Sequence, residues 1–186
     1  MKGMNDMIIE TDRLILRPWK ESDAESLYEY AKDPAIGPIA GWPPHQSVDE
    51  SLDVICNVFN GDECYAICEK ENDKAIGAIE LKLKGHTDMT DREDECELGY
   101  WLGKPFWGRG YMPEAVQELL RHGFENFGMT TIWCGYYDGN EKSKRVQEKV
   151  GFAYHHTCDE VSVPLMNEVR VGHTSIMTKE QWEKLR

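Results

Sequence analysis

The chain has 186 residues, 40% of them hydrophobic, and carries a formal net charge of −13 at pH 7. This length and apolar content fit one domain over residues 1–186, built around a single hydrophobic core. The acidic balance disfavours nucleic-acid binding, which depends on basic patches, and favours cationic partners such as amines.

Hydrophobic periodicity predicts strands and helices along the whole chain. Strands are expected at residues 13–19, 65–69, 75–83, 96–102, 131–136, 152–157 and 169–177. Helices are expected from residue 22, over 47–59, 113–127 and 141–150, and, as a short final element, over 179–185. Residues 34–44 and 85–94 are expected as loops, the second being either a connection near a functional site or an ordinary surface loop. A turn at 71–73 predicts an antiparallel hairpin.

Polar side chains and glycine mark the expected helix ends. Ser22 and Ser47 are expected as N-caps, with Glu25 and Glu50 as their capping-box partners. Gly128 stands where the glycine after a helix C-terminus belongs. These residues predict three helix boundaries from local chemistry alone.

Residues 96–116 combine a buried strand, a glycine-rich turn and a helix start. Gly108 and Gly110 allow a left-handed backbone and the close approach of a ligand, and Pro113 suits the first position of a helix. Such a turn leaves backbone N–H groups unpaired at the positive end of the helix dipole, which favours a phosphate group. Within the strand, Gly99 predicts either a bulge or the close approach of another backbone.

The two common nucleotide loops do not fit this turn. A dinucleotide fingerprint needs glycine at position 113, which is proline, and a Walker loop needs Gly-Lys-Ser/Thr where residues 110–112 are Gly-Tyr-Met. The Gly-x-Gly pattern alone is also compatible with an ordinary turn that binds nothing. A second stretch is needed to choose between these readings.

That stretch is Asn140-Glu-Lys-Ser143-Lys-Arg-Val-Gln-Glu-Lys-Val-Gly151-Phe152. It resembles the Asn-x-x-Ser…Gly-Phe segment of the GCN5-related N-acetyltransferase (GNAT) superfamily, and is most similar to the Rim type, the relatives of ribosomal-protein N-terminal acetyltransferases. Pro105-Phe-Trp-Gly108-Arg-Gly110 resembles the acetyl-CoA loop Gln/Arg-x-x-Gly-x-Gly/Ala, with proline at the Gln/Arg position. Residues 11–18 also resemble the first strand of this superfamily.

The resemblance implies an α/β fold with a mixed central sheet of roughly seven strands, splayed at its centre and flanked by helices. The order of strands and helices along the chain that periodicity predicts is the same as in this superfamily. It implies acetyl-CoA as co-substrate and transfer of the acetyl group to a primary amine, on a protein N-terminus or a small molecule, by direct attack in a ternary complex. The residues expected to bind acetyl-CoA are Leu102, Trp107, Gly108, Arg109, Gly110, Tyr111, Met112, Asn140 and Ser143. A rival reading is a catalytically silent acyl-CoA-binding module, because Gln147 stands where many members carry a catalytic tyrosine.

Acetyl transfer requires a base, because an amine with a pKa of about 8 to 10 is largely protonated at neutral pH. Glu97 is the chosen carboxylate, since it lies on the strand that leads into the glycine loop. A structural ion pair is the alternative for Glu97, and Glu80 on the neighbouring strand is the reserve base. A backbone N–H near Leu102 is expected to polarise the acetyl carbonyl.

Four positions receive roles from the resemblance. Rim-type relatives place a serine where this chain has Ser143, and its hydroxyl is expected to hydrogen-bond the leaving sulfur; satisfying local backbone groups is the alternative. Asn140 is suited both to cap a helix and to reach the pantetheine. Trp42 and His45 lie in or next to the aromatic loop that resembles the acceptor side, so they are the candidate acceptor-binding residues, with loop anchoring as the alternative. The acceptor and the choice between monomer and homodimer stay open.

No other feature predicts a site. Six cysteines form no Cys-x-x-Cys pair, so reduced, buried thiols are expected. Adjacent residues on a strand point to opposite faces, so His155 and His156 are not expected to chelate together, and no metal site is predicted. No apolar run approaches the ~20 residues of a membrane span and no signal-peptide pattern is visible, so a cytoplasmic protein without membrane association is expected.

Overall fold

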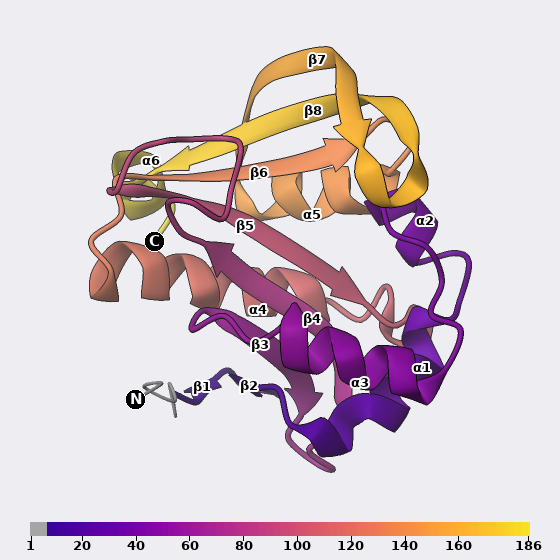
Figure 1. Ribbon diagram of the computed structural model, residues 1–186. Helices are drawn as coiled ribbons and strands as arrows, with labels where there is room; N and C mark the ends of the chain where they lie inside the picture. The colour runs from indigo at the N-terminus through magenta and orange to yellow at the C-terminus, as the bar shows by residue number, and fades with distance from the viewer. Residues whose placement is uncertain (1–6) are drawn as a thin grey trace.

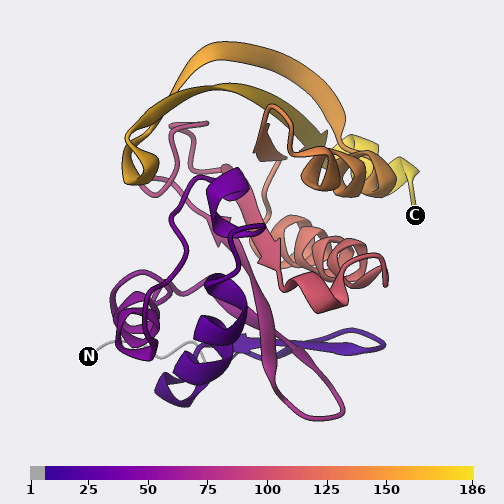
Figure 2. The ribbon, with the colours of Figure 1, turned by 90° about the vertical axis from the view of Figure 1, so that its right-hand side faces the viewer.

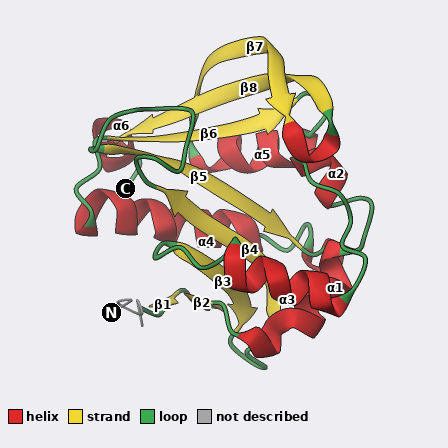
Figure 3. Ribbon diagram, in the orientation of Figure 1, coloured by secondary structure: helices red, strands yellow, loops and turns green. Residues whose placement is uncertain are grey.

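A computed structural model describes residues 7–186, and one twisted sheet runs through it (Figures 1 and 3). The sheet has eight strands in the order β1-β2-β3-β4-β5-β6-β8-β7. In chain order the strands are β1 (Ile9–Glu10), β2 (Leu14–Pro18), β3 (Cys64–Glu69), β4 (Ala75–Lys82), β5 (Glu95–Leu102), β6 (Thr131–Tyr137), β7 (Ala153–Val163) and β8 (Glu168–Thr178). The predicted mixed sheet is confirmed, and the short strand β1 adds one strand to the expected seven.

Helices cover both faces of this sheet. They are α1 (Ala24–Ala31), α2 (Gly37–Ala40), α3 (Val48–Asn57), α4 (Tyr111–Arg121), α5 (Glu141–Val150) and α6 (Lys179–Lys184). Figure 2 shows α1 and α3, in indigo and purple, on one side of the sheet, and α4 and α5, in salmon and orange, on the other. The face that carries α1 and α3 is called the front face below, and the face that carries α4 and α5 the back face.

The sheet opens at its centre, between β5 and β6. These two strands are the only parallel pair within residues 7–186, and their pairing runs from Glu95 opposite Thr131 to Leu98 opposite Cys134. Beyond these residues β5 continues to Leu102, paired with β4 alone, and β6 continues to Tyr137, paired with β8 alone, and Figure 1 shows the two strands diverging. The predicted splay is therefore confirmed, and it begins one residue before Tyr100.

The hydrophobic core lies mainly between the sheet and α4. Ala115, Val116 and Leu119 of this helix recur at helical spacing and are fully buried. They belong to one apolar cluster with Leu98 of β5 and Ile132 of β6. Truncating a buried leucine of this kind costs about 2–5 kcal/mol, so the packing fixes α4 firmly behind the splay.

Two predicted helix starts differ from the structure in the groups that their acidic side chains bind. The expected cap at Ser22 is wrong: a 3₁₀ turn covers Glu21–Asp23 and α1 starts after Asp23, whose carboxylate accepts the Lys20 N–H and pairs with buried Arg17 at 2.8 Å. The cap at Ser47 is confirmed, since its Oγ accepts the Glu50 N–H at 3.0 Å. The Glu50 side chain, however, accepts from the N–H of residue 46 rather than closing a box on Ser47.

The end points of other elements also shift. α4 begins at Tyr111, two residues before the predicted start at Pro113, and passes into a π-helix at His122–Asn126 before Gly128, whose φ of 67° confirms the predicted glycine stop. The loop over residues 34–44 contains the short helix α2. β4 and β5 pair without interruption across Gly99, so the bulge is wrong; a Cβ at Gly99 would lie 3.1 Å from Oε1 of Glu80, a side chain rather than a backbone.

The C-terminal hairpin departs from simple alternation. β7 and β8 are longer than expected, and their register shifts between Tyr154 and His156. The extra residue brings His155 and His156 together, with their Nδ1 atoms 2.7 Å apart, so the expectation that they point to opposite faces is wrong. Within residues 7–186 no cluster of three or more His, Cys, Asp or Glu side chains has the arrangement of a metal site.

The remaining expectations concern the cysteines, membrane-spanning helices and a signal peptide. All six cysteines are free, but Cys56 and Cys158 are exposed, so the expectation of buried thiols holds for only four. In the part of the chain that the structure describes, none of the helices combines the length and apolarity needed to cross a bilayer. The signal-peptide expectation falls partly on residues 1–6, which lie outside the described residues.

Candidate active site

A glycine turn at the end of β5 forms the first part of the site. A 3₁₀ helix at Lys104–Phe106 follows the strand, and Gly108 and Gly110 then take φ angles of 75° and 78°. A Cβ at Gly108 would meet no atom within 4 Å, so the turn is open on that side. Gly110 is the N-cap of α4, and the N–H groups of Tyr111 and Met112 in its first turn lack intrahelical acceptors. The predicted turn thus has the backbone geometry of an anion site.

A guanidinium that was not predicted braces this turn. Arg13, just before β2, donates through Nη1 to the Arg109 carbonyl at 2.9 Å and through Nε to Glu114 at 2.7 Å. Its guanidinium also lies 4.6 Å from the ring centroid of Tyr111. Arg13 and Arg109 are 96 positions apart in the sequence. Local sequence patterns therefore contain no signal for this contact. Arg13 therefore adds both rigidity and positive charge beside the open amides.

The splay supplies a backbone donor on β5. The Gly103 N–H donates to the Ile76 carbonyl on β4 at 2.7 Å. Since successive residues of a strand direct their N–H groups to opposite sides, the Leu102 N–H points away from β4, into the splay. The Leu102 carbonyl, on the same side, accepts the indole N–H of Trp107 at 2.8 Å, which ties the glycine turn to the strand.

The N-terminus of α5 closes the splay from the β6 side. Asn140 caps this helix, since its Oδ1 accepts the Ser143 N–H at 3.3 Å, as predicted. Lys142 places its ammonium 4.5 Å from the ring centroid of Trp107, so the two helix starts meet at the glycine turn. The predicted acetyl-CoA residues on β5, α4 and α5 are thereby brought to one edge of the sheet.

Behind the splay, Tyr100 reaches from β5 to α5. Its hydroxyl lies 3.0 Å from Ser143 Oγ and 3.2 Å from the Ser143 carbonyl oxygen. Gln147, one turn further along α5, places Nε2 3.4 Å from the same Oγ. Tyr100 was not predicted, because its meeting with Ser143 depends on how β5 and β6 diverge.

On the front face, Glu97 is held by two neighbours. Its Oε1 accepts from Lys82 Nζ at 3.0 Å and its Oε2 from Thr87 Oγ1 at 2.5 Å, and its side chain is only 14% exposed. Burial alone would lower the pKa of Lys82, but its attraction to Glu97 and Glu80 outweighs burial and raises it. The ion pair considered as an alternative for Glu97 is therefore present, and a role of Glu97 as base stays a prediction.

Glu80 lies on the same face, one step closer to the splay. It pairs in register with Gly99, the first β5 residue beyond the paired segment, and the missing side chain there leaves its carboxylate room. Its Oε1 is 3.8 Å from Lys82 Nζ. Burial, opposed in part by Lys82, raises the pKa of Glu80. Such a carboxylate binds a proton more readily than an ordinary surface glutamate.

The loop over residues 83–94 covers this front face. Besides Thr87 on Glu97, Thr90 donates to Glu95 at 2.7 Å. A Cβ at Gly135 of β6 would lie only 2.6 Å from the Met89 methyl group. Of the two alternatives for this segment, the structure therefore favours a connection beside the functional site.

The two aromatic residues of the acceptor prediction differ in position. Trp42 packs edge to face on Trp101 of β5 at 5.7 Å, which places it beside the front face of the splay. His45 is only 8% exposed, its Nδ1 lies 2.8 Å from Ser51 Oγ, and burial lowers its pKa. Loop anchoring therefore describes His45 well, and contact of either residue with an acceptor stays a prediction.

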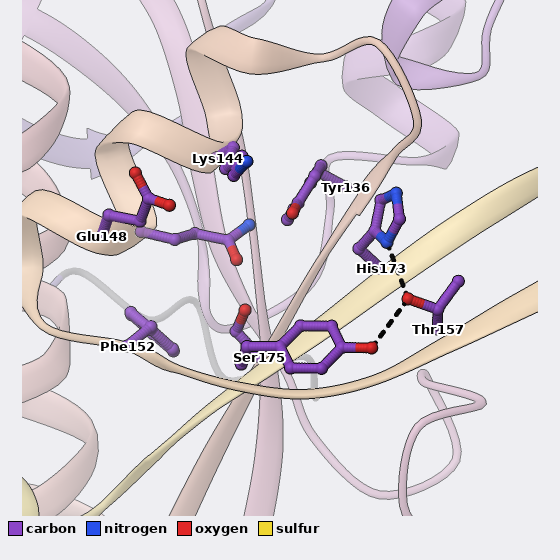
Figure 4. Close-up of a pocket in the computed structure, with 9 residues that line it drawn as sticks. Tyr136, Lys144, Glu148, Phe152, Thr157, His173 and Ser175 are labelled. Atoms are coloured by element: carbon purple, nitrogen blue, oxygen red, sulfur yellow. Dashed lines mark hydrogen bonds between the residues drawn. The ribbon is translucent and has the colours of Figure 1, made fainter.

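A separate hollow lies on the back face, between α5 and the C-terminal strands (Figure 4). Tyr136, Lys144 and Ser175 are among the residues that line it. His173 and Thr157 are joined here at 2.8 Å, and Asp138 bonds the other His173 nitrogen at 2.9 Å. Neither the glycine turn nor the front-face carboxylates line this hollow, but Gln147, which approaches Ser143 Oγ, does.

Comparison with known proteins assigns the chain to a family. The family model described as an acetyltransferase (GNAT) domain matches residues 13–153. An uncharacterized N-acetyltransferase, p20 of Bacillus licheniformis, is 29% identical over 148 residues, covering 76% of this chain and 80% of that protein. A putative ribosomal N-acetyltransferase of Bacillus subtilis, YdaF, is 36% identical over 65 residues, 35% of this chain and 34% of that protein.

Solved structures agree on the fold. The structure of a putative ribosomal-protein-serine acetyltransferase from Vibrio cholerae superposes with a TM-score of 0.78 at 20% identity, covering 94% of this chain and 99% of that one. A GNAT-family acetyltransferase from Bacillus anthracis also gives 0.78, at 21% identity and the same coverage. With the family model matching most of the sequence and the splayed sheet matching these folds, the chain belongs to the GNAT family of acetyltransferases.

Proposed function

We propose that residues 1–186 form one catalytic domain that transfers an acetyl group from acetyl-CoA to a primary amine, by direct attack in a ternary complex. One observation carries this proposal. At the β5–β6 splay, an open helix N-terminus lies on the back side and a partly buried acidic cluster on the front side. A thioester held in the splay would thus have an anion site at one end and a base at the other.

The donor side fits acetyl-CoA in its chemistry. The open amides of residues 108–112 suit a pyrophosphate, and glycine at 108 and 110 removes the side chains that would cover them. The free N–H of Leu102 suits the thioester carbonyl, and Asn140 stands where the pantetheine amides would pass. Pro105, which departs from the family loop, has no amide to offer, but the phosphate-facing amides all follow it in the chain. When bound, acetyl-CoA supplies an activated acetyl group with a thiolate leaving group.

For the base, we favour Glu80 over Glu97. Both oxygens of Glu97 are already occupied by Lys82 and Thr87, whereas the nearest cation to Glu80 is 3.8 Å away. Glu80 also has the raised pKa that suits a base working near neutral pH. In this proposal Glu80 accepts the amine proton, directly or through one water, and Glu97 keeps Lys82 charged and in place.

The acceptor is proposed to be a cationic amine that enters from the front face. Glu80, Glu97 and Lys82 together leave that face with excess negative charge, and Trp42 and Trp101 offer aromatic surface beside it. The chain is similar to proteins with ribosomal N-acetyltransferase names, so a protein N-terminus is one candidate acceptor, and a small-molecule amine is the other.

The alternative function is a silent acyl-CoA-binding module, which Gln147 at the usual tyrosine position keeps open. The test is to incubate the chain with acetyl-CoA and a panel of peptides and small amines, and to measure free thiol and acetylated product together. Stoichiometric release of both supports transfer. Tight acetyl-CoA binding by calorimetry without product for any amine would support the module instead.

A further inference from the structure

Tyr100 occupies the point where the central sheet opens. It lies two residues beyond the last β5–β6 pair, on the same side of β5 as Leu98, and its ring spans to α5. Its hydroxyl lies 3.0 Å from Ser143 Oγ and 3.2 Å from the Ser143 carbonyl oxygen, and the side chains of Gln147 and Cys134 also interact with it. The contact with Ser143 joins β5 to α5, the helix that follows β6, at a level where β5 and β6 no longer pair with each other.

The hydrogen bonds around Ser143 Oγ limit where its proton can go. A serine hydroxyl donates one hydrogen bond and accepts two. The Gln147 amide must turn its NH₂ toward the Gly135 carbonyl at 3.3 Å, because a carbonyl only accepts. The same NH₂ then donates to Ser143 Oγ at 3.4 Å, and this orientation leaves Gln147 Oε1 buried without a partner among the described residues. The Tyr100 hydroxyl has one proton, which can go either to the Ser143 carbonyl oxygen or to Oγ. With that proton on Oγ, both acceptor positions of Oγ are filled and the Ser143 proton is left for a third group.

We propose that Tyr100 is a positioning residue that, with Gln147, directs the Ser143 hydroxyl toward the leaving sulfur. This inference rests on the proposed function. Glu80 takes one proton from the entering ammonium, directly or through one water. The C–N bond then forms and the C–S bond breaks, the electron pair goes to sulfur as thiolate, and the second proton that the nitrogen loses passes to water. Ser143 donates a hydrogen bond to that thiolate, and Tyr100 keeps its own proton throughout.

The environment of Tyr100 agrees with a donor that does not ionise. Burial raises the pKa of its hydroxyl well above the ordinary value of 10, with smaller opposing effects from Ser143 and Gln147. The hydroxyl therefore stays protonated across neutral pH. Gln147, which lacks an acidic proton, contributes its NH₂ as the second donor, so the missing tyrosine at 147 is compensated by a tyrosine from the strand.

The test is a double-mutant cycle in the full chain with Tyr100→Phe and Ser143→Ala. Tyr100→Phe should lower kcat by about tenfold, the worth of one oriented hydrogen bond, with the KM for acetyl-CoA within about twofold. The loss should be equal at pH 6 and pH 9, because Tyr100 does not titrate there. The double variant should be no slower than Ser143→Ala alone. Tyr154→Phe is the matched control: its hydroxyl is exposed on β7, bonds Thr157, and its removal should leave kcat unchanged.

The outcomes separate this inference from the proposed function. If wild type releases no thiol with any amine, the proposed function fails first. If wild type turns over, an unchanged kcat in Tyr100→Phe, or losses that multiply in the double variant, overturns the positioning role. If Tyr100→Phe does not fold, Gln147→Met removes the other donor to Ser143 and answers the same question: coupling to Ser143→Ala supports the network, and independent losses overturn it.

Discussion

The donor side and the acceptor side of the splay are built from different parts of the chain. The donor side, residues 102–112 with Asn140, presents mainly backbone N–H groups, whose direction follows from the path of a strand, a glycine turn and a helix. The acceptor side presents the side chains of Glu80, Lys82 and Glu97, whose charges depend on one another. Binding by backbone N–H groups should survive most side-chain substitutions that leave the backbone path unchanged, whereas the acidic cluster should lose its function when one of its side chains is replaced.

The substitution Gly110→Val should have the largest effect on acetyl-CoA binding at the donor side. At a φ of 78° a β-branched residue is strained, and its side chain would point toward Arg13, 3.5 Å from the Cβ position, and over the open amides. We expect acetyl-CoA affinity to fall by about 100-fold or more, measured by calorimetry. Gly128→Val is the matched control, because Gly128 has a similar φ of 67° and no atom within 4 Å of its Cβ position, yet lies far along the chain from the turn. Equal affinity in a folded Gly110→Val protein would contradict the donor site.

The substitution Glu80→Gln tests the acceptor side, because glutamine keeps the shape of the side chain but cannot accept the amine proton. If Glu80 is the base, kcat should fall by roughly 10²–10⁴, the usual worth of a positioned base, while acetyl-CoA binding is retained. Because burial raises the pKa of Glu80, the acid limb of wild-type kcat/KM should lie above the ordinary glutamate value, and the variant should lose that limb. Glu97→Gln should lower kcat by about tenfold or less, because Lys82 would then be held less firmly. The reverse order of the two variants would return the base to Glu97.

The same contrast explains what sequence could predict. Strands, helices and the glycine turn follow from local periodicity and local backbone chemistry, and they were predicted. The splay was expected only from the resemblance to the family. The cap at Ser22 failed because Asp23, which forms a buried ion pair with Arg17, accepts the Lys20 N–H, and the helix starts after it. Arg13 and Tyr100 were missed because their partners lie on other elements. The pairing of Glu97 was left open because strand residues alternate in direction, so the sequence alone allowed either a base in the site or a structural ion pair.

A smaller effect should come from the charge and aromatic surface of the acceptor side. If the acceptor is cationic, its KM should rise with salt, while acetyl-CoA affinity falls less, because screening weakens the attraction to Glu80 and Glu97. Trp42→Ala should raise the acceptor KM by about threefold to tenfold, with kcat little changed, and Trp42→Phe should recover most of the loss. Steady-state kinetics from 0.05 to 0.5 M salt, a range of screening lengths from about 14 to 4 Å, would check both. Indifference of the acceptor KM to salt and to Trp42→Ala would remove this surface from the acceptor path.

The smallest effects concern stability, and here the two sides should respond with opposite sign. Burial raises the pKa of Glu80 in the folded state, so its charge costs stability once pH rises through that folded pKa, and the cost disappears below the unfolded value near 4.3. Burial alone would raise the pKa of Glu114 on α4, but hydrogen bonds from Thr11 and Arg13 outweigh it and lower the pKa. Glu114 therefore contributes stability above the unfolded pKa that is lost as pH falls through the folded one.

Glu80→Gln should accordingly raise the Tm at pH 8 by about 1–3 °C, and Glu114→Gln should lower it by a similar amount or more. The Glu80 difference should close as pH approaches 4, because its carboxyl is then protonated in the folded and unfolded states. The Glu114 difference should persist to lower pH, because its folded pKa is lowered. Thermal unfolding from pH 4 to pH 8 measures both. A fall in Tm at pH 8 for both variants would mean that Glu80 is held by its neighbours as firmly as Glu114 is, and a carboxylate so held is a poor base.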